Sequence, residues 1–178
     1  ETITNGSAKY YNVSTILVPP YHADDLGYLY NHAAADSLCP EGWHLPTDEE
    51  WQKLEQYVDT LGTGSNTTIT FGDSAMTTYA KYIVVPGDFS WFNTTSADDK
   101  IHFNAYPAGA RQLSTLVPQG VGMYGYRLAG FWTATAQPNT TDKYYARVID
   151  PTSIGEKILR DGVNHAIGFS VRCVRANN

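Results

Sequence analysis

The 178-residue sequence contains no long hydrophobic run, no cluster of basic residues and no internal repeat. Its most apolar short stretch, TILVPP, is interrupted by two prolines and is far shorter than the ~20 residues that a membrane-spanning helix needs. The 12 Lys and Arg residues are scattered among 18 Asp and Glu residues, giving a net charge of −6, so we expect no nucleic-acid partner. Without a recurring period of about 20–50 residues, a solenoid or propeller is also excluded.

Cysteine is scarce, and the spacing of the two cysteines excludes the usual redox and zinc motifs. Cys39 and Cys173 lie almost at opposite ends of the chain, unlike the close pairs of such sites. We favour one long-range disulfide over two separate buried thiols. Closing a loop of this length contributes about 4–5 kcal/mol on the chain-entropy model. A disulfide also favours an oxidising, extracellular compartment, so we expect an exported protein.

Motifs for catalysis and cofactor binding are missing as well. The GVGMYG segment matches the glycine pattern of dinucleotide sites, but a proline precedes it and no helix start follows, so we interpret it as a loop. The five histidines form no HExxH pattern, and no GxSxG elbow is present. We therefore expect no cofactor, no metal and no catalytic residue. Adjacent acids at Asp24 and Asp25, or at Asp98 and Asp99, are more typical of solvated loops than of calcium or acid–base sites.

The clearest local signal is a helix start at Thr47. Glu50 follows three residues later, which is the spacing of a capping box. Apolar residues then recur at helical steps, and Gly62 is the expected C-cap. The sequence predicts that this helix buries the apolar stripe Trp51, Leu54, Val58 and Leu61 and exposes Gln52, Lys53, Glu55, Gln56 and Asp59.

The remaining pattern predicts one α+β domain. A second, weaker helix is expected in DSAMTTYAKYI, capped by Asp73 or Ser74. Strands are expected in GYLYNH, HFNAYPAGA, GFWTATA, YYARVI, EKILRD and GFSVRCVR. The interval from residue 88 to 141 is rich in Gly, Pro, Asn and aromatic residues. Long ordered loops of this kind are often functional.

Aromatic and amide side chains in this loop-rich interval are the candidate ligand contacts. Exposed rings with polar neighbours suit a saccharide or a protein surface. The QPN tripeptide could bind sugar hydroxyls or calcium, although a turn is the simpler interpretation. The candidate ligand-binding residues are Tyr124, Tyr126, Arg127, Gln137 and Asn139.

The order and spacing of five segments resemble the Fibrobacter succinogenes major paralogous domain. These segments are LGYLYNHAAADSLCPEGWHLPTDEEWQKL, FNAYPAGAR, GYRLAGFWTAT, YYARVI and GFSVRCVR. The family is similar to C-type-lectin-like domains and to the domain of formylglycine-generating enzymes. The resemblance implies a C-type-lectin-like fold with two helices flanking antiparallel sheets and a long loop region. It also implies that Cys39 bonds Cys173, with Trp43 and Leu45 packed in the core.

The same resemblance sets the expected domain limits. Residues 26–178 would form the C-type-lectin-like domain, and residues 1–25 an N-terminal arm or extra strand. Because the sequence begins at Glu1 without a Met, we expect that a leader was removed; a lipid anchor preceding residue 1 is compatible with this start.

Departures from these relatives argue against an enzyme. Formylglycine-generating enzymes use reactive cysteines near the chain end, where only Cys173 is found here. Calcium-dependent lectins follow a QPD-like tripeptide with WND, which YYARVID lacks. We therefore expect a non-catalytic cell-surface binding or adhesion module with a glycan or protein ligand. The alternatives are a hydrolase or formylglycine-generating-type enzyme, and a structural subunit of a surface assembly.

Overall fold

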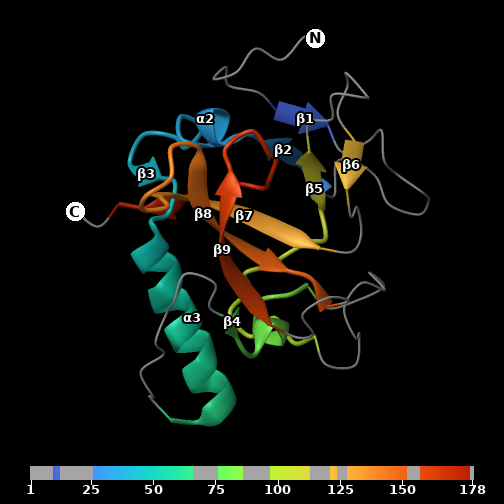
Figure 1. The fold of residues 1–178 in the computed structure, drawn as a ribbon. Helices are drawn as coiled ribbons and strands as arrows, with labels where there is room; N and C mark the ends of the chain where they lie inside the picture. The colour runs from blue at the N-terminus through green and yellow to red at the C-terminus, as the bar shows by residue number, and fades with distance from the viewer. Residues whose placement is uncertain are drawn as a thin grey trace.

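The computed structural model describes residues 10–12, 26–65, 76–85, 97–112, 121–123, 128–151 and 157–176. Within these ranges the chain has two α-helices, one 3₁₀ helix and short antiparallel strands, which is the predicted α+β class (Figure 1). The helical elements are α2 (His32–Ala35), α3 (Asp48–Thr63) and the 3₁₀ helix η2 (Ala80–Tyr82). The strands are β1 (Tyr10–Asn12), β2 (Tyr28–Tyr30), β3 (Trp43–His44), β4 (Met76–Thr77), β5 (Ala110–Gln112), β6 (Val121–Met123), β7 (Ala129–Ala136), β8 (Lys143–Ile149), β9 (Ile158–Asn164) and β10 (Val174–Arg175).

A four-stranded antiparallel sheet lies at the centre, in the order β4-β9-β8-β7. Trp132 of β7 is opposite Ala146 of β8. The first five residues of β7 are all buried. Successive side chains of a strand point to opposite faces, so both faces of the sheet are covered here. The predicted strands GFWTATA, YYARVI and EKILRD are confirmed at β7, β8 and β9.

The predicted start of helix α3 is confirmed, but its predicted end is wrong. The Glu50 amide donates to the Thr47 hydroxyl at 3.2 Å, and the Thr47 amide donates to the Glu50 carboxylate at 2.8 Å. The left-handed C-cap is Gly64, with φ 70°, rather than Gly62. Gly62 lies inside the helix. A glycine is needed at this position because a Cβ would come within 2.4 Å of the Tyr79 ring.

The predicted apolar stripe of α3 is correct for Trp51 and Val58, which are buried. The expected exposure of Glu55 and Asp59 is wrong, because their exposed fractions are only 1% and 9%. Helical spacing alone places both residues on the polar side of the helix. It does not reveal the residues distant in sequence that bind their carboxylates in the fold. Asp59 accepts from the Thr78 hydroxyl at 3.3 Å.

Glu55 instead joins a buried ionic cluster that α3 forms with two arginines of β8 and β9. Arg147 donates to Asp48 at 2.7 Å and also pairs with Glu55, while Arg160 donates to Asp48 at 2.8 Å. Burial alone would raise the pKa of Asp48, but the hydrogen bonds from Arg160 and Arg147 outweigh it and lower that pKa. Two positive and two negative charges thus compensate each other where the helix meets the sheet.

The predicted second helix is wrong in its described part. Met76 and Thr77 form β4, which pairs with Leu159 and Ile158 of β9, and only Ala80–Tyr82 is helical. Tyr79 has a left-handed backbone with φ 66°, which a continuous α-helix does not accommodate. The proposed caps Asp73 and Ser74 lie outside the described residues.

Two other predicted strands are only partly formed. In HFNAYPAGA, His102 and Asn104 have positive φ values of 55° and 53°, and extended pairing is limited to bridges at Ala105 and Gly109 and to the start of β5. In GFSVRCVR, Phe169 bridges to Tyr30, and β10 pairs with β3 further on. The predicted GYLYNH strand is confirmed by β2.

The core consists of two clusters on the central sheet. One surrounds Trp51, Ile83 and Phe131, and the other surrounds Trp132 and Phe169. Leu45 is buried in the second cluster as predicted. Trp43 was expected in the core, but 47% of its surface is exposed, because it lies on the small sheet made only of β3 and β10.

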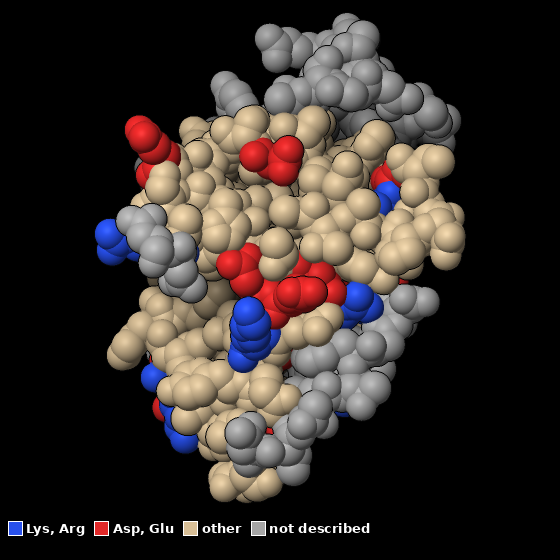
Figure 2. Space-filling model, turned by 90° about the vertical axis from the view of Figure 1, so that its left-hand side faces the viewer, with Lys and Arg blue, Asp and Glu red and all other residues tan. Residues whose placement is uncertain are grey.

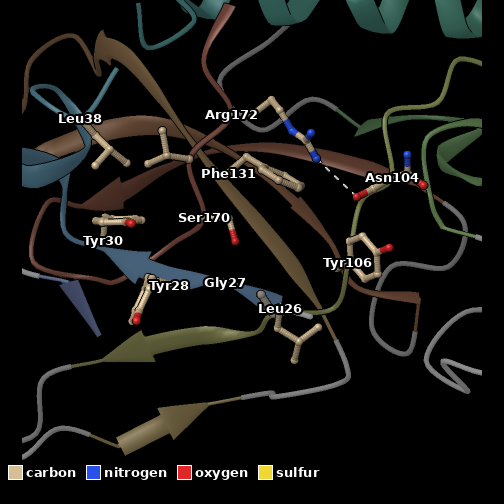
Figure 3. A pocket seen from close by; sticks show the side chains of 12 residues that line it. Leu26, Gly27, Tyr28, Tyr30, Leu38, Asn104, Tyr106, Phe131, Ser170 and Arg172 are labelled. Atoms are coloured by element: carbon tan, nitrogen blue, oxygen red, sulfur yellow. Dashed lines mark hydrogen bonds between the residues drawn. The ribbon is translucent and has the colours of Figure 1, made fainter. Parts of the chain in front are cut away.

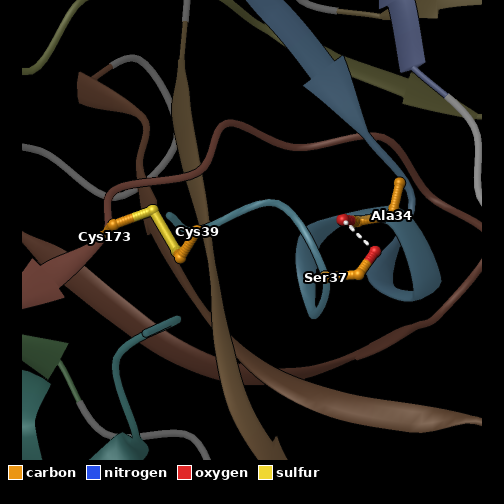
Figure 4. The surroundings of a disulfide bond; sticks show 4 residues. All are labelled: Ala34, Ser37, Cys39 and Cys173. Carbon is orange, nitrogen blue, oxygen red and sulfur yellow. Dashed lines mark hydrogen bonds between the residues drawn. A yellow bond between two sulfur atoms is a disulfide. The ribbon is translucent and has the colours of Figure 1, made fainter. Parts of the chain in front are cut away.

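A disulfide between Cys39 and Cys173 confirms the predicted pairing (Figure 4). The two Cα atoms are 5.7 Å apart, and the residues are separated by 134 positions in sequence. Cys39 follows α2 and Cys173 precedes β10, so the bond joins the early part of the domain to its last strand.

Residues near the N-terminus also join the fold. β1 pairs antiparallel with β2, with Tyr10 opposite Tyr30. The division at residue 25 stays a prediction. No helix in the described part of the chain is long and apolar enough to cross a membrane.

Candidate functional site

A pocket of about 280 Å³ opens between β2, β7 and the segment that precedes Cys173 (Figure 3). Its walls combine aromatic, aliphatic and polar groups from five separate parts of the chain. The lining residues are Leu26, Gly27, Tyr28, Tyr30, Leu38, Asn104, Tyr106, Ala108, Phe131, Ser170, Val171 and Arg172. We call this the tyrosine pocket, after the three tyrosines in its wall.

The rim of the tyrosine pocket exposes large apolar side chains. Tyr28 and Leu38 are 46% and 42% exposed, and they are two of the four most exposed large hydrophobic residues of the described chain. The rings of Tyr28 and Tyr30 meet edge to face at 6.5 Å. Large exposed apolar groups that gather around a hollow mark ligand or partner sites more often than isolated ones do.

The base of the pocket is rigid. Phe131 comes from the buried part of β7, and its ring packs at 5.6 Å from Trp51 and 5.4 Å from Phe103. In Figure 3, Tyr30 and Leu38 lie on one side of the pocket and Tyr106 on the other. A ligand between them would contact side chains anchored in the core of the domain.

Arg172 is the one charged residue among the described residues that line the pocket. Its Nη2 donates to the backbone carbonyl of Phe103 at 2.8 Å and, at 3.4 Å, to that of Asn104. Its guanidinium also lies 4.7 Å from the centre of the Phe103 ring. These contacts hold the side chain in place. Burial lowers the pKa of Arg172, and the nearby Asp99 carboxylate opposes this shift electrostatically without forming a direct ion pair.

The disulfide lies directly behind two walls of the pocket. Leu38 precedes Cys39, and Arg172 precedes Cys173, so the bond fixes the distance between these two lining residues. The bridge between Tyr30 and Phe169 holds β2 against the same C-terminal segment. The long-range bond therefore shapes the candidate site as well as stabilising the fold.

A second, mainly apolar pocket of about 250 Å³ lies on the other side of Arg172. Its lining residues are Pro46, Glu50, Trp51, Leu54, Phe103, Arg172 and Val174. The carboxylate of Glu50 is already engaged, because it accepts from Thr47 and lies 2.9 Å from His44 Nε2. Burial would raise the pKa of Glu50, but the hydrogen bonds from Thr47 and His44 lower it.

His32 belongs to the scaffold next to these pockets. Its ring stacks on Tyr144 with centroids 3.4 Å apart, and its Nε2 lies 2.9 Å from the Thr133 carbonyl oxygen. Burial lowers the pKa of His32, which favours the neutral ring. Among the described residues that line the tyrosine pocket there is no His, Asp, Glu or Cys, so this part of the chain brings no acid–base pair or thiol to it.

Of the five residues predicted from sequence, the two that the structure describes, Gln137 and Asn139, do not line this pocket. Gln137 and Asn139 lie in the turn between β7 and β8, where Asn139 is exposed with φ 61°. The Gln137 side chain packs against Gly162 instead of facing a cavity. The QPN tripeptide is thus a turn, which was the simpler interpretation. Tyr124, Tyr126 and Arg127 lie outside the described residues.

The proposed acidic sites can be placed in part. Asp98 is exposed and lies 3.7 Å from Lys100, whereas Asp99 is buried and accepts from the Asn104 amide at 3.1 Å. Within the described ranges no three His, Cys, Asp or Glu residues come together as a metal site would require. Asp24 and Asp25 lie outside these ranges.

Surface charge is mixed on the face shown in Figure 2. Acidic side chains gather near its centre, with basic ones beside them, and most of the remaining described surface is uncharged. The basic side chains on this face form no continuous patch, in agreement with their scattering in the sequence.

Comparison with protein families identifies the chain. The family model described as the Fibrobacter succinogenes major domain matches residues 2–175. The chain therefore belongs to this family, as the order of its segments indicates. Searches of curated proteins and of solved structures returned no match.

Proposed function

We propose that the protein is a non-catalytic binding module that holds its ligand in the tyrosine pocket. The observation that carries this proposal is the pocket itself, in which the exposed ring of Tyr28 and the half-buried rings of Tyr30 and Tyr106 line a rigid base. Rings with hydroxyl groups combine an apolar face with polar edges, as binding of a sugar requires. A glycan is therefore the favoured ligand class, and a protein surface is the alternative.

The chemistry of the pocket wall supports binding rather than catalysis. Hydrolysis by general acid–base catalysis needs paired titratable groups near the substrate, and the lining supplies only Arg172 as a charged residue. An enzyme of the formylglycine-generating kind needs a reactive thiol. Cys173 is instead bonded to Cys39. The enzyme alternative is weaker for both reasons.

We also propose export to the cell surface and a C-type-lectin-like fold. The disulfide supports export because such bonds persist in oxidising compartments. The closing contact between β3 and β10 near the disulfide supports the fold proposal, since the ends of the domain meet there. Tyr124, Tyr126 and Arg127 stay candidate ligand contacts on the basis of the sequence alone.

A glycan array probed with the isolated protein tests the ligand class. Ala substitutions at Tyr28 and Tyr106 should each weaken capture of a positive glycan by at least about tenfold, or about 1.4 kcal/mol, because each removes a ring from the pocket wall. The matched control is Tyr57→Ala, since Tyr57 is 54% exposed on α3 and does not line the pocket.

Thermal unfolding of the three variants separates loss of a contact from loss of the fold. Capture by Tyr28→Ala and Tyr106→Ala at the level of the Tyr57→Ala control would contradict the proposed site. If no glycan binds on the array and a protein ligand is captured through the same tyrosines, glycan is rejected as the ligand class. The assignment of the tyrosine pocket as the ligand site would then stand.

A further inference from the structure

The charge of the tyrosine pocket narrows the class of sugar that it would accept. Arg172 is the only charged residue in the described part of its lining, so this part of the wall carries one positive charge. Within the described chain no carboxylate lies within salt-bridge distance of this guanidinium. The positive charge therefore has no direct ion pair there, although the buried Asp99 carboxylate offsets it in part from a longer distance.

The hydrogen bonds of Arg172 leave donors available. A guanidinium has five N–H donors arranged to match a carboxylate in a two-point contact. Only Nη2 is occupied, by the carbonyl oxygens of Phe103 and Asn104. No hydrogen bond to Nη1 or Nε is formed in the described part of the chain.

The guanidinium is also held in advance of binding. It lies over the Phe103 ring, and Phe103 in turn packs on Phe131 and Trp51. The adjacent disulfide fixes the backbone at the next residue, Cys173. A guanidinium that is held in place before binding loses less side-chain conformational entropy when it binds an anion.

The rest of the wall suits a sugar ring attached to such an anion. Tyr28, Tyr30 and Tyr106 offer ring faces, while Asn104 and Ser170 offer short polar groups. Figure 3 shows Arg172 and Asn104 together on one side of the pocket, linked by their hydrogen bond, with Tyr30 across from them. A ligand could thus place its ring among the tyrosines and its charged group beside Arg172.

We propose that the tyrosine pocket selects a carboxylate-bearing sugar, such as a uronic acid residue, and that Arg172 pairs with the carboxylate. This inference rests on the proposed function, because it names the ligand of the same site.

The test compares oligogalacturonides with the same oligomers after methyl esterification, which removes the charge and keeps the sugar ring. By isothermal titration calorimetry, we expect the wild-type protein to bind the acid about tenfold or more tightly than the ester, as a charged hydrogen bond at a partly exposed site would give. The Arg172→Gln variant should bind both forms equally. Arg175→Gln, with the same charge change at an exposed residue outside the pocket, should keep the wild-type ratio.

The acid-to-ester ratio stays informative even if Arg172→Gln is less stable, because both forms are measured on the same variant. An equal affinity of the wild-type protein for acid and ester would overturn the inference while leaving a neutral sugar as the ligand. An acid-to-ester ratio that stays at the wild-type value in Arg172→Gln would overturn it by showing that another group recognises the carboxylate. Failure of both forms, with no glycan bound on the array, would reject the inference and the proposed glycan ligand together. Arg172-dependent capture of a peptide with a free carboxylate, without sugar binding, would also reject the sugar class.

Discussion

Arg147 illustrates how single residues connect distant parts of this domain. Its side chain is fully buried and pairs with Asp48 and Glu55, which lie 99 and 92 positions away in sequence. Removing the guanidinium would leave two carboxylates with incomplete compensation in a buried position. The cluster therefore penalises any separation of α3 from the sheet.

Arg147→Met should lower the free energy of unfolding by about 3–5 kcal/mol, because one partner of a buried ionic cluster is lost. The control is Lys100→Met, which breaks an exposed pair with Asp98 and should cost at most about 1 kcal/mol. Urea unfolding followed by tryptophan fluorescence measures both. Equal effects of the two substitutions would show that the cluster adds nothing beyond an exposed ion pair.

Residue-level predictions from sequence were successful where the determinants are local. The Thr47 capping box needs only residues three positions apart, and the structure forms it as expected. The burial of Glu55 depends on Arg147, so the helical pattern gave no sign of it. The sequence likewise places Arg172 in a predicted strand and does not indicate that it lines a pocket. The pocket forms only when Arg172 meets Tyr28 and Tyr106, which are distant in sequence.

At the level of elements, α3 is fixed by a close approach to the segment that follows it. Gly62 lies in the last turn, and a Cβ there would come within 2.4 Å of the Tyr79 ring. Tyr79 also stacks on Tyr82, with ring centroids 5.9 Å apart, which limits its freedom to move away. The contact joins the end of the helix to η2.

Gly62→Ala provides a test in which two effects have opposite signs. Helix propensity alone would make this change stabilising by about 1 kcal/mol. Because the added methyl group meets the Tyr79 ring, we expect a net loss of about 1–3 kcal/mol in the free energy of unfolding. The double variant Gly62→Ala with Tyr79→Ala measures the coupling: destabilisation by Gly62→Ala should disappear there. A stabilised single variant would contradict the packing.

Helices and strands were predictable where a continuous run of residues favours one secondary structure. They were missed where the backbone angle of a single residue interrupts that run. β7 and β8 have runs of β-branched and aromatic residues and formed as expected. The second helix failed because Tyr79 adopts a positive φ. Positive φ at His102 and Asn104 likewise interrupts the predicted strand and turns Asn104 and Tyr106 to the pocket.

At the level of the whole molecule, one covalent bond links stability to the candidate site. The disulfide closes a separation of 134 residues and lies behind Leu38 and Arg172, which line opposite parts of the tyrosine pocket. The pairing was predictable from the number and positions of the cysteines. The pocket was not, because it forms only where β2, β7 and residues 104–108 and 170–172 converge.

A crystal structure of the protein with a sugar that it binds tests the central claim most directly. We predict electron density for the sugar in the tyrosine pocket, with its ring against Tyr28 or Tyr106 and within reach of Arg172. Density at the turn of Gln137 and Asn139, or at any other place with the tyrosine pocket empty, would contradict the assignment of this pocket as the ligand site.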